Sequence, residues 1–238
     1  MMTRRLSTPR SERAELAEHA ERWSGFVLAN ILWAILSLPV ITLPAATAGL
    51  FAYMSERARG RQPDVVSTFF GAARRHWRKA TVLACLDLLV GGLVVLNGLI
   101  FARMDFTTDP LAFLARSVTL FVALALLLIN LYSWALLVLL ETMSLRRLIR
   151  SAAALVFAHP FWSIGVLTAA ALPVLISLLL PQGIFVIATA SLCAWIICAG
   201  TWRVIREHLA PELLASLQEQ PKSSQDLPLT KRNHGGNE

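Results

Sequence analysis

Long stretches of apolar residues with almost no charge constrain this chain more than any other feature. Five such runs are present, at 24–54, 80–102, 117–140, 163–180 and 184–205. A helix that crosses the hydrocarbon core of a bilayer needs roughly 20 apolar residues, so each of the last four runs fits one crossing. Since a helix satisfies its own backbone hydrogen bonds in lipid, the sequence predicts an all-α, polytopic membrane bundle.

The composition excludes other classes of protein. Hydrophobic residues make up 56% of the chain and charged residues 16%. Globular chains contain about 45–50% apolar residues and about 25% charged residues. A soluble fold of this length could not hide so much apolar surface. The three cysteines lie inside apolar runs and lack metal-ligand spacing, so neither a disulfide framework nor a metal site is expected.

Polar segments flank the predicted membrane domain. We expect a cytoplasmic amphipathic helix over 1–23, a membrane domain over 24–205, and a polar, disordered cytoplasmic tail over 206–238. Lysine and arginine gather just outside the apolar runs, where they meet lipid headgroups. The net charge of +7 therefore indicates contact with the lipid bilayer rather than with nucleic acid.

The first run is interrupted by Pro39 and Pro44. It is too long for one comfortable crossing and too short for two full ones. If the run enters and returns on one side, the Lys and Arg residues divide twenty inside against two outside. If it crosses once, they divide fifteen against seven. The positive-inside rule favours the re-entrant arrangement, and a single kinked crossing remains the alternative.

Two basic amphipathic segments are predicted at the cytoplasmic surface. The first, 65–79, places five apolar residues on one helical stripe beside basic residues; the stripe consists of Val66, Phe69, Phe70, Ala73 and Trp77. Its basic residues are candidate contacts for lipid headgroups; they are Arg74, Arg75, Arg78 and Lys79. The second segment, 141–162, carries Arg146, Arg147 and Arg150.

Asp87 is the most informative polar residue inside an apolar run. A carboxylate at that depth is costly unless it faces protein or water, or is protonated. Asn130 lies at a comparable depth on the antiparallel third run and is the expected partner, and Asn30 lies in the first run. Asp87, Asn130 and Asn30 form the candidate intramembrane polar site. This site is either a proton or cation site or a set of hydrogen bonds between helices.

No group of residues in the sequence indicates a reaction. The chain contains no phosphate-binding loop, no dinucleotide-binding turn and no nucleophile elbow, and no histidine pair has zinc-ligand spacing. We therefore expect no enzyme activity, no metal and no other cofactor.

A pattern of Asn, Trp, Ser, Pro and Thr residues over 30–48 resembles a known family. The residues of this pattern are Asn30, Trp33, Ser37, Pro39, Thr42, Pro44 and Ala48, and they are followed by Phe69–Phe70 and the basic block 74–79. This resembles the amino-terminal signature of the YesL-like family of uncharacterised bacterial membrane proteins. Leu43 stands where that family commonly has glycine. The resemblance is specific over 30–79, and a weaker similarity of layout extends over 22–200.

The resemblance implies a multi-pass protein of the bacterial inner membrane, often encoded beside carbohydrate uptake and degradation systems. One hypothesis is an accessory or regulatory protein that binds a sugar-transport permease or another membrane protein. The alternative is a small transporter or permease with a site at the broken first helix and Asp87. The lack of an internal repeat and the scarcity of intramembrane charge favour the accessory hypothesis.

Overall fold

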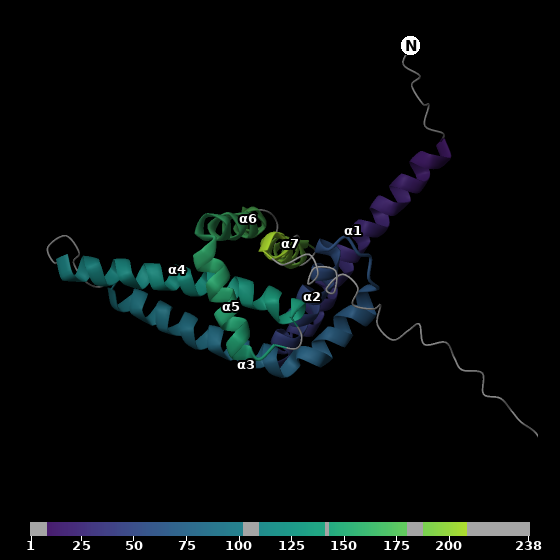
Figure 1. Cartoon of the computed structure of the whole chain (residues 1–238). Coiled ribbons are helices and arrows are strands. Elements are labelled where there is room, and N and C mark those ends of the chain that lie inside the picture. Colours follow the sequence, from purple (N-terminus) through teal and green to yellow (C-terminus); the bar gives the residue numbers. More distant parts are fainter. Residues whose placement is uncertain (1–8, 102–109, 141–142, 180–187, 209–238) are drawn as a thin grey trace, which may run out of the picture. The chain divides into compact units, whose positions relative to one another are not determined.

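The computed structural model describes residues 9–101, 110–140, 143–179 and 188–208, and this part of the chain contains helices and no strands. The all-α prediction is therefore confirmed for it. The helices are α1 (Pro9–Ser37), the short 3₁₀ helix η1 (Val40–Thr42), α2 (Leu43–Ala58), α3 (Val65–Phe101), α4 (Pro110–Leu139), α5 (Leu145–Ala158), α6 (Pro160–Leu179) and α7 (Ala190–His208) (Figure 1). The chain divides into two compact units between Trp202 and Arg203, and the description below concerns the first.

Three helices in the described ranges are long and apolar enough to cross a membrane. They contain the candidate spans Val65–Ile100, Phe113–Leu139 and Pro160–Ser177, and Trp23–Ser37 is a shorter apolar helix. The chain is thus a membrane protein. The described residues do not confirm the predicted count of five segments. Residues 180–187, which include the end of the fourth predicted run and the start of the fifth, fall outside the described residues, as does the tail from residue 209.

Two predicted boundaries are not helix ends in the structure. α1 continues through residue 23 into the first apolar run, and α3 joins the basic segment 65–79 to the second run as one helix. Neither junction contains a proline, and the neighbouring residues support uninterrupted helix. At the start of α3, the Ser67 backbone N–H donates to Asp64 Oδ2 over 2.8 Å. This hydrogen bond lowers the pKa of the exposed Asp64 carboxyl group and caps the helix.

The break between α1 and α2 follows from the two prolines. Proline has no N–H and disfavours helix at the preceding residue, so α1 ends at Ser37, and Pro44 fits the first turn of α2. Other donors form hydrogen bonds with carbonyl groups at the break. The Thr42 hydroxyl lies against the Leu36 and Pro39 carbonyls, and the Leu43 N–H donates to the Val40 carbonyl. The turn therefore keeps its backbone hydrogen-bonded where the helix cannot.

α1 and α2 form an antiparallel hairpin around this turn. The Trp33 Nε1–H donates to Thr47 Oγ1 over 3.2 Å near the turn, while the Arg57 guanidinium lies 4.9 Å from the centre of the Phe26 ring at the open end. The tip is apolar and projects from the chain, with Leu38, Val40 and Ile41 exposed by 80%, 80% and 89%.

The core of the first unit forms where α2 packs against α3 and α4. Its buried side chains include Leu50, Tyr53 and Met54 of α2, Phe69 and Leu83 of α3, and Tyr132 and Leu136 of α4. The α2 and α3 backbones approach closely at Gly49, because a Cβ there would lie 2.8 Å from the Phe69 carbonyl oxygen. The predicted apolar stripe on α3 is divided between this core and the surface. Phe69 and Ala73 face this core, while Val66, Phe70 and Trp77 are exposed.

We expect Gly49→Ala to lower the stability of the bundle by about 1–3 kcal/mol, because the added methyl group must push α2 away from the α3 backbone. The matched control is Gly91→Ala, since a Cβ at Gly91 meets nothing within 4 Å, and it should not destabilise. Unfolding of the purified protein in detergent, followed by circular dichroism, measures both. Equal stability losses for the two variants would contradict the close packing of α2 on α3.

Candidate functional site

Asp87 of α3 meets two residues of α4. The Trp134 Nε1–H donates to Asp87 Oδ2 over 3.1 Å, and the Asn130 side chain lies beside the Asp87 carboxyl group. Further along the same antiparallel pair of helices, Asn97 Nδ2 donates to Thr119 Oγ1 over 3.3 Å. The partly buried carboxyl group thus faces neutral donors on the neighbouring helix, as a carboxyl group within an apolar helix must face a polar partner or water.

Trp134 is the residue of this cluster that sequence reasoning missed. It lies four positions after Asn130, and residues four apart share a helix face. That spacing could have identified it as a second donor toward Asp87. Only the structure shows that its indole nitrogen reaches the carboxyl group.

Phe51 connects the Asp87 cluster to the hairpin. The Phe51 and Trp134 ring centroids are 6.1 Å apart, and the Phe51 carbonyl accepts a hydrogen bond from Cys198 Sγ of α7 over 3.6 Å. Contacts from one residue of α2 therefore extend to both α4 and α7.

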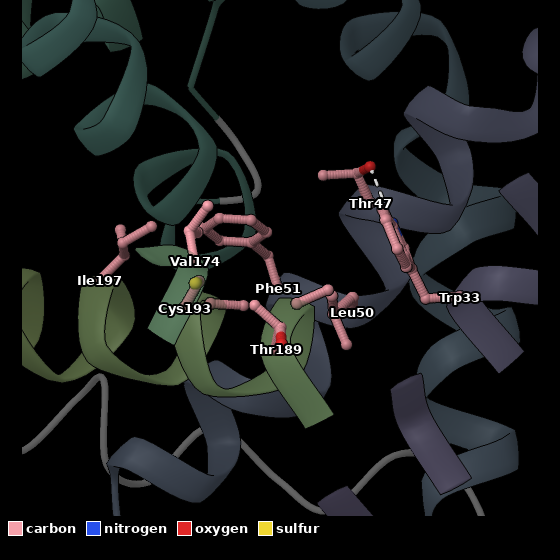
Figure 2. Close-up of a pocket in the computed structure, with 10 residues that line it drawn as sticks. Trp33, Thr47, Leu50, Phe51, Val174, Thr189, Cys193 and Ile197 are labelled. Atoms are coloured by element: carbon pink, nitrogen blue, oxygen red, sulfur yellow. Dashed lines mark hydrogen bonds between the residues drawn. The ribbon is translucent and has the colours of Figure 1, made fainter. Parts of the chain in front are cut away.

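A cavity of about 250 Å³ lies between the hairpin and helices α6 and α7. Figure 2 shows Trp33 and Thr47 on one side of it, joined by their hydrogen bond, and Val174, Cys193 and Ile197 on the other. The remaining lining residues are Leu50, Phe51, Thr189, Ala190 and Ala194. The lining carries no charged side chain, and neither Asp87 nor Asn130 belongs to it. Such a cavity suits apolar groups better than ions.

Asn30 does not join Asp87. It is fully buried, and its Oδ1 accepts a hydrogen bond from the Ser191 backbone N–H over 2.9 Å. The Ser191 hydroxyl also lies 3.1 Å from Asn30 Oδ1 and 3.0 Å from the Phe26 carbonyl. The structure therefore brings two of the three predicted site residues together and uses the third to fasten α1 to α7.

The candidate headgroup residues lie on α3 beyond its packed face. Arg74, Arg75 and Arg78 are exposed, and the Arg78 guanidinium lies 5.3 Å from the centre of the Trp77 ring. Lys79 differs from them, because its Nζ donates to the Met143 carbonyl over 3.0 Å.

This arrangement offers little chemistry beyond hydrogen bonding and the binding of one proton at Asp87. Across the described ranges, no three His, Cys, Asp or Glu side chains are grouped so that they could hold a metal ion. The contacts of Asp87 with Trp134 and Asn130 provide neutral partners rather than a second titratable group.

Comparison with known protein families gives one partial match. Residues 26–98, which include the end of α1, all of α2 and most of α3, match a family described as "Protein of unknown function, DUF624". This match is consistent with the YesL-like resemblance but assigns no activity. The chain matches no curated protein and no solved structure.

We expect Asp87→Asn to be nearly silent, because the amide keeps an acceptor oxygen for the Trp134 indole. Asp87→Leu should destabilise by about 0.6–2 kcal/mol, the range for polar contacts between helices in lipid. Trp134→Phe supplies the partner variant. If the contact is structural, the double variant Asp87→Leu/Trp134→Phe should lose less than the sum of the two single losses. Unfolding in detergent measures the four variants and the unaltered protein, and an Asp87→Leu variant as stable as the unaltered protein would contradict the structural role.

Proposed function

We propose that this chain is an accessory or regulatory subunit of the bacterial inner membrane, which binds another membrane protein through the apolar half of α3. The observation that carries this proposal is an open face on that half, formed by Gly91, Val95 and Gly98. A Cβ at either glycine meets nothing within 4 Å, and Val95 is exposed.

The spacing of these residues suits the binding of another helix. Positions 91, 95 and 98 follow one another at intervals of four and three, so they share one face of α3. Small residues let two helix backbones approach closely, and in lipid this close packing, rather than the hydrophobic effect, drives helices together. The partner class comes from the YesL-like resemblance, which favours a sugar-transport permease and thus a role in carbohydrate uptake.

We further infer that the first apolar run is re-entrant and leaves both of its ends on the cytoplasmic side. The antiparallel α1–α2 hairpin, its exposed apolar tip and the charge distribution support this reading. With α7 as the last segment, the membrane domain then has the five predicted apolar segments.

The second candidate function, a small transporter, draws on the cavity beside the broken first helix. Phe51 lines that cavity and also contacts Trp134, the partner of Asp87. The apolar lining weakens this candidate, because sugars and ions need polar groups along their path.

Photo-crosslinking in native membranes tests the accessory role. A crosslinking amino acid at Val95 should capture a distinct membrane protein, identified by mass spectrometry. The same group at Leu83, which is 2% exposed, is the control and should capture none. Gly91→Leu and Gly98→Leu should reduce capture from Val95, whereas Gly165→Leu on α6, where a Cβ also meets nothing within 4 Å, should not.

Two outcomes would contradict the proposal. One is the absence of any protein partner crosslinked from Val95. The other is pH-driven uptake of a sugar or an ion by the purified protein alone in proteoliposomes, abolished by Asp87→Asn, which would identify a transporter.

A further inference from the structure

We propose that the basic residues of α3 and α5 form one binding surface for the phosphate headgroups of anionic phospholipids. The surface consists of Arg74, Arg75 and Arg78 on α3 and of Arg146, Arg147 and Arg150 on α5. It would serve an accessory protein and a transporter equally, so it does not depend on the function proposed above.

The contact that joins the two helices is the hydrogen bond from Lys79 Nζ to the Met143 carbonyl, 3.0 Å long. Lys79 follows Arg78 on α3, and Met143 immediately precedes Ser144, the N-cap residue of α5. The first turn of α5, with Arg146 and Arg147, therefore starts beside the last basic residues of α3. Figure 1 shows this end of α5 next to α3.

The charge on this surface has a single sign. All six arginines are exposed, and neither Val65–Leu86 of α3 nor α5 contains an aspartate or glutamate. A basic side chain near an anionic membrane surface contributes about 1 kcal/mol of binding free energy. Several arginines at one place can therefore distinguish anionic from zwitterionic lipid.

Exposed apolar side chains beside the arginines indicate a lipid rather than another polyanion. Val66, Phe70 and Trp77 lie exposed on the basic part of α3, and Phe157 lies exposed near the end of α5. Aromatic rings next to basic residues suit the boundary between headgroups and acyl chains. An acidic protein or a nucleic acid would match the charge but not these apolar side chains.

The experiment uses the full-length protein in a neutral detergent, titrated with phosphatidylglycerol or with phosphatidylcholine. A ligand that binds the folded state raises the unfolding temperature, so phosphatidylglycerol should raise it and phosphatidylcholine should not. Salt should reduce the shift, because exposed charges are screened. Each variant is compared with its own lipid-free unfolding temperature, so a change in basal stability does not enter the result.

Two triple variants test whether the arginines of α3 and α5 form one lipid-binding surface or two independent ones. Arg74→Gln/Arg75→Gln/Arg78→Gln should remove most of the phosphatidylglycerol shift, and so should Arg146→Gln/Arg147→Gln/Arg150→Gln. A variant with all six changes should lose little more of the shift than either triple variant, because each half of the surface binds the lipid only together with the other half. The corresponding Arg→Lys variants should keep the shift, and Arg116→Gln on α4 is the control that should leave it unchanged.

Equal shifts with the two lipids would overturn the proposal. So would losses that add up between the α3 and α5 variants, since these indicate two independent contacts. A loss of the shift in Arg116→Gln as large as in either triple variant would also overturn it, because the effect would then reflect net charge alone.

Discussion

The structure depends on how backbone polar groups are satisfied at the break between Ser37 and Leu43. Unpaired N–H and C=O groups cost several kcal/mol each in lipid, and two prolines remove the usual helical donors there. The Thr42 hydroxyl and the Leu43 N–H take over the exposed carbonyls. Because these donors come from the turn itself, the chain can reverse direction within an apolar surrounding.

That reversal places the other elements. It returns α2 along α1, so that Trp33 meets Thr47 and Phe26 meets Arg57. α2 then presents Gly49 to α3 and Phe51 to Trp134 of α4. The hairpin is held from another side as well, since Asn30 binds the backbone of Ser191 on α7. Polar contacts thus fasten the hairpin at its turn and to α7, while close apolar packing joins it to α3 and α4.

Local patterns in the sequence predicted the elements better than the contacts between them. Apolar runs and prolines located the helices and the break, because length and backbone chemistry act within one segment. Depth along two antiparallel helices placed Asn130 opposite Asp87, where the structure has it. The same reasoning could not separate Asn30 from Asp87 or find the Trp134 contact, because those depend on how helices pack side by side. It also divided α1 and α3 at changes in polarity, although polarity alone does not end a helix.

The central claim is that the first apolar run returns to the side from which it enters. Single cysteines at Ser24, Gln62 and Ile41, in a variant without the native cysteines, test it with a membrane-impermeant thiol reagent. Ser24 and Gln62 are exposed near the two ends of the hairpin, and Ile41 lies at its tip. The account predicts that Ser24→Cys and Gln62→Cys react only from the cytoplasmic side and that Ile41→Cys does not react from the outside. Reaction of Ser24→Cys and Gln62→Cys from opposite sides would contradict it and establish a single kinked crossing.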